Sequence, residues 1–307
     1  MSRWPLWGMA LLLLCTQSET SRHGDDQVPF EYEQIGTLND AALREISGMA
    51  LSKIDDDVLW VVNDSGDDAL LYAISKKGNL VQTCRIKNAE NQDWEDLASF
   101  TLADTAYLVI ADIGNNVRHR DIFTLYILKE PRVVGGTVTA SVPVDRIIRF
   151  QYQDGPRDCE AMAVDVDRNA IVILSKRNAP PLLYSIPLDA NPDEIVVARL
   201  LGHVHSIPEP QEDEIVSYLD RFHAQPTALD LASRGHQVAI LTYRRLFLYP
   251  RADDETLIET VNKEALMIEF PKLEQAESMC FDFDQESVLI TSEQLPAPLI
   301  RITPTSF

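Results

Sequence analysis

Five segments of the chain share one alternation of polar and apolar positions. Each begins with a polar residue, continues through two short apolar stretches separated by a turn, and ends in a polar residue 16 or 17 positions after the first. The first and last residues of the five copies are Ser47 and Asp64, Glu95 and Asp112, Glu160 and Lys176, Thr227 and Tyr243, and Glu277 and Glu293. Two antiparallel strands joined by a turn return to the edge where they began. Each copy therefore predicts two polar side chains side by side at one edge of a sheet.

Further strands are predicted after each pair. Apolar third segments follow at 70–74, 124–128, 182–186, 245–249 and 298–302, and short branched segments follow at 80–86, 146–153, 195–204 and 266–270. The fifth copy stops after its third segment, and residues 30–36 are expected to supply the missing strand. Repeats of roughly 40–50 residues that each form a four-stranded sheet are typical of a β-propeller. We expect an all-β propeller of four-stranded blades, five in number with six as the alternative, closed by the N-terminal strand.

The longest interval between copies, residues 190–225, does not fit another strand pair. It carries prolines and an acidic stretch, 212–219, whose pattern indicates a helix.

The N-terminus has the pattern of an export signal. Residues 1–18 contain one positive charge, a short apolar run and then small polar residues, so we expect a signal peptide over 1–24 followed by one propeller domain over 25–307. No long apolar segment follows, and the mature protein is expected in the periplasm or outside the cell without a transmembrane segment. Lipid attachment at Cys15 is not favoured, because Leu14 stands where a small residue would be needed.

Composition narrows the possible partners. The chain has 27 basic and 48 acidic residues, a formal charge of −21, which argues against nucleic acid or an anionic membrane and attracts cations. Cys84, Cys159 and Cys280 remain after the signal, and their odd number and wide spacing do not suggest a disulfide framework. We interpret Cys159 and Cys280, which lie in first strands, as buried small hydrophobes. Six histidines without paired cysteines do not suggest a zinc or iron site.

The repeated polar positions should meet at one place. In a propeller the first strand of every blade lines the central channel, so all ten residues are expected around one mouth of that channel. Six of them are acidic, and like charges this close raise one another's pKa unless cations or basic partners compensate them.

Three explanations for this acidic mouth remain open. Oxygen ligands from Glu95, Glu160, Glu277 and Asp112 could bind Ca²⁺ or a similar hard cation. Two carboxylates could act as the acid and base of a glycosidase. Basic residues, namely Lys176, Arg177 and Arg244, could neutralise the acids and leave a structural plug. Few tryptophans are present to bind sugar rings, and the loops at 63–68 and 112–116 are rich in oxygen donors and glycine, which favours the cation over the glycosidase.

Several strings resemble those of a known group. The segments 46–50, 61–66, 93–98, 111–116 and 158–163 are similar to those of an uncharacterised family of exported bacterial β-propeller proteins related to the phytase-like and TolB-like propellers, and the resemblance covers the chain from about residue 35. Calcium-dependent phosphatases and lactone or ester hydrolases of similar form hold a metal at the channel mouth with acidic residues. The resemblance implies that role for Glu95, Glu160 and Glu277. Those relatives usually have six blades, and five-bladed glycosidases with three channel carboxylates are the other precedent.

These observations lead to one functional hypothesis and two alternatives. The hypothesis is an exported propeller with a Ca²⁺ or other hard divalent cation at the mouth, which hydrolyses phosphate or carboxylic esters with activated water, because no nucleophile motif is present. Glu95, Glu160 and Glu277 would be metal ligands, Asp112 and Asp64 ligands or general base, and Lys176 with Arg244 would hold a small polar or anionic substrate. The alternatives are a non-enzymatic propeller that binds a protein partner and a carboxylate-based glycosidase.

Overall fold

The computed structural model describes residues 30–117, 119–134, 140–232 and 235–305, and this part of the chain is built mainly of strands. The signal peptide expected over 1–24, with Cys15, lies outside the described residues. A first sheet has the order β2-β3-β4-β5-β9. Its strands are β2 (Ile46–Leu51), β3 (Val58–Asn63), β4 (Leu70–Ser75), β5 (Leu80–Lys87) and β9 (Ala140–Pro143).

The second sheet has eight strands in the order β11-β12-β13-β14-β10-β8-β7-β6. They are β6 (Trp94–Leu102), β7 (Thr105–Asp112), β8 (Phe123–Lys129), β10 (Arg146–Tyr152), β11 (Cys159–Asp165), β12 (Ala170–Ser175), β13 (Leu182–Pro187) and β14 (Ile195–His203). The third sheet consists of β15 (Pro226–Leu231), β16 (Gln237–Thr242), β17 (Arg245–Pro250) and β18 (Leu266–Glu269). The fourth consists of β19 (Ala276–Phe281), β20 (Val288–Ser292), β21 (Ala297–Pro304) and β1 (Phe30–Leu38).

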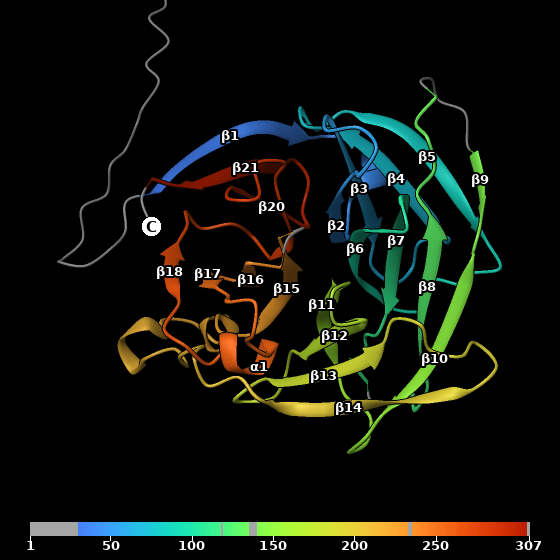
Figure 1. Cartoon of the computed structure of the whole chain (residues 1–307). Coiled ribbons are helices and arrows are strands. Elements are labelled where there is room, and N and C mark those ends of the chain that lie inside the picture. The colour runs from blue at the N-terminus through green and yellow to red at the C-terminus, as the bar shows by residue number, and fades with distance from the viewer. Residues whose placement is uncertain (1–29, 118, 135–139, 233–234, 306–307) are drawn as a thin grey trace, which may run out of the picture.

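The innermost strands form a closed circle. β2 contacts β6 and β19, β6 contacts β11, and β15 contacts both β11 and β19. Figure 1 shows these strands around the centre, with β1, β18, β14 and β5 on the outside. The chain therefore has a propeller-like all-β fold.

The ring closes between the two ends of the described chain. β1 pairs antiparallel with β21, from Phe30 opposite Pro304 to Leu38 opposite Ala297. This pairing satisfies an edge of β21 that would otherwise be exposed. The predicted pairing of the N-terminal segment with the last strand is confirmed.

Two parallel contacts join strands that are distant in sequence. β10 pairs with β14, which merges two groups of four strands into the eight-stranded sheet, and β9 pairs with β5. Strands were expected where β5, β10, β14 and β18 lie, but these parallel contacts and β9 were not.

The helix expected over 212–219 is not formed. The structure has two short 3₁₀ turns there, η2 (Glu212–Glu214) and η3 (Leu219–Phe222). Ile215 follows η2 with φ −92° and ψ 89°, which is outside the helical region and ends the turn. The one α-helix among the described residues is α1 (Leu257–Thr260). None of the described helices is long and apolar enough to span a membrane.

The apolar core lies between neighbouring sheets. Trp60 and Leu71 of the first sheet pack in one cluster with Trp94 and Ile110 of the second, for example. β2 and β3 are buried along their whole length because both of their faces are covered. Cys84, Cys159 and Cys280 are buried, and for Cys159 and Cys280 the sequence had predicted this.

Candidate functional site at the acidic mouth

The five repeated first-strand residues share one backbone feature. In each innermost strand the ladder skips one residue, and the skipped residues are Ser47, Glu95, Glu160, Thr227 and Glu277. A β-bulge leaves one residue unpaired and re-aims its side chain. The bulge explains why these positions leave the regular alternation of the strands and turn toward the mouth or the neighbouring sheet.

Two of the five fasten neighbouring sheets together. Ser47 donates a buried hydrogen bond of 2.6 Å to the carbonyl oxygen of Trp94, and Thr227 donates one of 2.7 Å to that of Ala276. Trp94 and Ala276 stand directly before the next repeated glutamates, Glu95 and Glu277. The hydroxyl positions therefore hold the strands that carry the acids, and they are not part of the acidic group.

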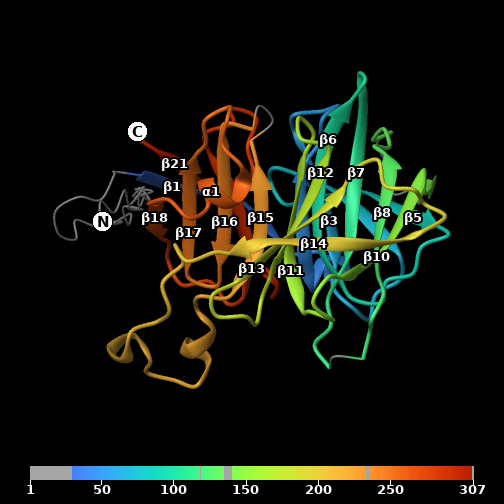
Figure 2. The same cartoon turned by 60° about the horizontal axis from the view of Figure 1, so that its bottom comes forward.

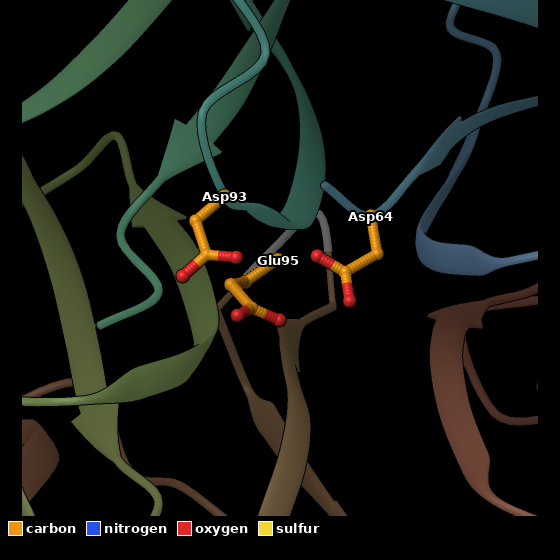
Figure 3. A group of neighbouring side chains, drawn as sticks. All are labelled: Asp64, Asp93 and Glu95. Atoms are coloured by element: carbon orange, nitrogen blue, oxygen red, sulfur yellow. The ribbon is translucent and has the colours of Figure 1, made fainter. Parts of the chain in front are cut away.

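Asp64, Asp93 and Glu95 form a compact group of carboxylates. Asp64 follows β3, Asp93 precedes β6, and Glu95 lies in the bulge of β6; one oxygen of each lies within 4.8 Å of the others. Figure 3 shows Asp64 and Asp93 on either side of Glu95, with their carboxylates turned toward it. Ligand oxygens of Ca²⁺ lie at about 2.3–2.6 Å, so two ligands on opposite sides of the ion are about 4.8 Å apart. Three oxygens no farther apart than this can all contact one calcium-sized ion.

Gly114 makes room for this group. A Cβ atom at this position would lie 2.1 Å from Oε1 of Glu95 and 2.5 Å from Cγ of Asp93. The backbone N–H of Gly114 also donates a 3.2 Å hydrogen bond to the carbonyl oxygen of Asp93. A side chain at position 114 would therefore have to displace the carboxylates of Glu95 and Asp93.

The protein compensates this group only in part. The charge of Lys176 opposes the rise in the pKa of Glu95 and Asp64, and that of Arg120 opposes the rise for Asp93, but burial outweighs both. Burial, and then the charges of Glu160 and Asp64, raise the pKa of Glu95 well above its usual value, and burial raises the pKa of Asp64 to about 6. Burial also raises the pKa of Asp93. Glu95 is 5% exposed, and its Oε1 has no hydrogen-bond partner among the described residues. A buried carboxylate oxygen without a donor is costly, and a bound cation would remove that cost.

Lys176 compensates the other side of the mouth. Its ammonium forms a buried ion pair with Glu160 and lies 5.3 Å from the ring centre of Tyr243. The Tyr243 hydroxyl in turn donates a 3.0 Å hydrogen bond to Glu277. Burial alone would lower the pKa of Lys176, but Glu160, Tyr243 and Glu277 raise it overall, so Lys176 stays charged. Glu160 and Glu277 thus have partners in the chain that Glu95 does not have.

The remaining predicted residues lie in different surroundings. Glu293 faces the charges of the mouth: burial, then Glu277 and Asp64, raise its pKa to about 7. Asp112 is buried and pairs with Arg120 at 2.7 Å, and it accepts a 3.2 Å hydrogen bond from the backbone of Asp93. Asp112 thus holds the backbone of Asp93 in place. Arg177 pairs with Asp158, and Arg244 contacts Glu269 at 3.3 Å in a separate cleft.

The structure thus brings together most of the residues predicted for the mouth, and adds one. Asp93 was not a candidate, because it lies two positions before the repeated Glu95 and outside the repeat register. Its signal in the sequence is the pair of acids that brackets Trp94 just before an innermost strand. The role predicted for Asp112 as a ligand or base stays a prediction, and its contact with Arg120 argues for a supporting position.

Comparisons with known proteins add little to this geometry. No family model matches the sequence, and no curated protein matches it. Among solved structures, hydrazine synthase of Kuenenia stuttgartiensis is similar to this chain with a TM-score of 0.44 and 7% identity, over 81% of this chain and 80% of that chain. This likeness is too low to transfer any chemistry. The resemblance to phytase-like and TolB-like propellers stays a prediction.

Proposed function

We propose that the chain is a five-bladed propeller with four strands in each blade. The five innermost strands, β2, β6, β11, β15 and β19, would each begin a blade, and β1 would complete the fifth. In this interpretation the eight-stranded sheet is two blades joined by the parallel contact between β10 and β14. The five bulges then fall at equivalent positions around one mouth.

We further propose that this mouth binds a hard divalent cation, Ca²⁺ in the first place, through Asp64, Asp93 and Glu95. The observation that supports this most directly is the buried, unpartnered oxygen of Glu95 beside two further carboxylates at calcium spacing. The donor set is oxygen only, which suits Ca²⁺ better than zinc. The proposal changes the ligand set expected from the sequence, since Glu160 and Glu277 already contact Lys176 and Tyr243.

An exported protein would use such a site differently from a cytosolic sensor. Calcium sites of extracellular modules work at dissociation constants of about 10⁻⁴–10⁻³ M. We propose that the protein is exported, on the basis of its N-terminal pattern. We therefore expect its calcium site to have a dissociation constant in this range. Hydrolysis of phosphate or carboxylic esters stays a prediction.

Calcium titration tests the cation site. With Ca²⁺ at about 100 times its dissociation constant, the folded protein should gain about 2.7 kcal/mol, a rise in melting temperature of about 5 °C. Glu95→Gln should weaken calcium binding at least thirtyfold in calorimetry and leave the protein in chelator at least as stable, because it removes one of several like charges.

Glu31→Gln is the matched control, since it makes the same change on the exposed face of β1. It should bind calcium like the natural chain. Absence of both a heat of binding and a melting shift for Ca²⁺ and Mg²⁺ would refute the site.

A further inference from the structure

A cleft of about 450 Å³ lies beside the third sheet, outside the acidic mouth. One wall is the segment 208–224, which projects from the ring in Figure 2 (ochre and orange). The opposite wall is the turn between β16 and β17, with Arg244 and Arg245, and the segment after β18, with Lys272. Such a volume is in the range of small-molecule sites.

The turn between β16 and β17 separates this cleft from the mouth. Tyr243 turns its side chain to Glu277 and Lys176 at the mouth, whereas Arg244, the next residue, lines the cleft. The two sites therefore share one turn but no side chain.

Two guanidinium groups in the cleft have few acceptors. Arg244 contacts Glu269 through one nitrogen at 3.3 Å, and Arg245 contacts Glu214 through one nitrogen. Nη1 of Arg244 and Nε of Arg245 have no hydrogen-bond partner among the described residues. A guanidinium has five N–H donors and matches the two oxygens of a carboxylate or phosphate. Lys272 adds a third positive charge at the exposed rim.

The acidic residues of the cleft already have partners. Glu214 and Glu269 contact the two arginines, while Asp220 contacts His223 at 3.1 Å and accepts a hydrogen bond from the backbone N–H of Val216 at 2.9 Å. Glu269 has a side chain that is 55% exposed, and contacts of this kind contribute little. An incoming anion could replace such a contact at low cost.

The rest of the lining is mostly apolar, with Ser217 and Thr242 as its polar members. Phe247 of β17 lies on one side, and Pro208, Pro210 and Ala224 of the projecting segment lie on the other. Proline restricts the backbone of this segment, so part of the wall is ordered before a ligand arrives. A ligand that fits has an oxyanion head for the arginines and an apolar body for this wall.

We propose that this cleft binds a small organic anion, a carboxylate or phosphate attached to an apolar group. The site is independent of the proposed cation site. Ligands of about ten non-hydrogen atoms would bind with dissociation constants near the millimolar range.

Saturation-transfer difference NMR with phenyl phosphate and with benzoate tests the proposal on the full chain. We expect binding of at least one probe, and about tenfold or greater weakening in Arg244→Gln, because a charged hydrogen bond is lost. Thr242 Oγ1 accepts the backbone N–H of Arg245 at 3.0 Å and that of Arg244 at 3.4 Å, so the turn does not depend on the guanidinium groups. Lys272→Gln, at an exposed position, is the second variant and should weaken binding about twofold to fivefold.

Arg85→Gln is the matched control. Arg85 is an exposed arginine of β5 that also contacts one carboxylate, that of Asp68 at 2.9 Å. This variant should bind both probes like the natural chain. The proposal would be overturned if neither probe binds, if Arg244→Gln binds as tightly as the natural chain, if Arg85→Gln weakens binding equally, or if benzyl alcohol binds as tightly as benzoate.

Discussion

Glu95 and Asp96 are neighbours in β6, both buried, and yet they differ in their hydrogen bonds. Asp96 accepts 2.8 Å and 2.7 Å hydrogen bonds from the backbone N–H groups of Leu97 and Met162, the second across to β11. Glu95 has an oxygen with no partner and faces two more carboxylates. Burial raises the pKa of both, so a perturbed pKa does not separate a structural acid from a candidate ligand.

A second interior carboxylate repeats the arrangement of Asp96. Asp230 of β15 accepts 2.8 Å hydrogen bonds from the backbone of Leu231 and, across to β19, of Phe281. Inside the ring, acids join innermost strands of neighbouring sheets, whereas at the mouth the acids around Glu95 face one another. The candidate site is therefore distinguished by acids that lack hydrogen-bond donors, and not by the number of acids.

Asp96→Ala should have the largest effect on stability. It leaves two buried backbone N–H groups without acceptors, at about 1–3 kcal/mol each, so we expect a loss of about 3 kcal/mol in the free energy of unfolding. Urea unfolding in chelator and in saturating Ca²⁺ should show the same loss. A loss no greater than that of Glu95→Gln would mean that the two neighbours do not differ as described.

Glu160→Gln should come next and separates the two sides of the mouth. Lys176 would lose its ion-pair partner but keep Tyr243 and the charge of Glu277 nearby, so a loss of about 2 kcal/mol is expected, less than for an isolated buried charge. The loss should be equal in chelator and in excess Ca²⁺, and the calcium affinity should change less than threefold. Stabilisation in chelator together with abolished calcium binding would show instead that Glu160 is a ligand, as the sequence analysis expected.

The repeat pattern predicted the strands well because each one is marked by local apolar runs. The innermost strands, the ring closure by β1 and the short outer strands follow from this pattern. No local sequence pattern predicts the parallel contacts of β10 with β14 and of β9 with β5, because these contacts depend on how the outer edges of the sheets meet in space. The prediction of a helix over 212–219 was wrong, because the acidic stretch has helix-like spacing but its backbone leaves the helical region at Ile215.

The sequence predicted where the candidate site lies, but not which of its side chains contact one another. The constant spacing places Glu95, Glu160, Lys176 and Glu277 at one mouth, because equivalent strands of a ring converge. Which acid meets Lys176 depends on side-chain directions that spacing does not determine. Arg244 shows the same limit, since neighbouring residues of one turn face opposite ways and only Tyr243 reaches the mouth.

The smallest predicted effect concerns pH and Glu293. Burial raises the pKa of Glu293 from about 4.5 to about 7, so the folded protein holds this proton more tightly than the unfolded chain. In chelator, the free energy of unfolding should therefore fall as pH rises from about 4.5 to about 7, and this contribution should level off above. Because Glu293 is partly exposed, solvent screening reduces the effect to about 1 kcal/mol. Asp64, with a pKa of about 6, acts in the same direction.

Urea unfolding of the natural chain and of Glu293→Gln between pH 4.5 and 8 measures this contribution. The free energy of unfolding of Glu293→Gln should fall less with rising pH than that of the natural chain. Glu31→Gln, at an exposed position, should follow the natural chain. Saturating Ca²⁺ should reverse the slope, because the cation binds the ionised carboxylates and its binding strengthens as they lose protons. If the free energy of unfolding of Glu293→Gln falls with pH as much as that of the natural chain, the fall comes from the general repulsion of a chain with charge −21. Glu293 would then not contribute to it.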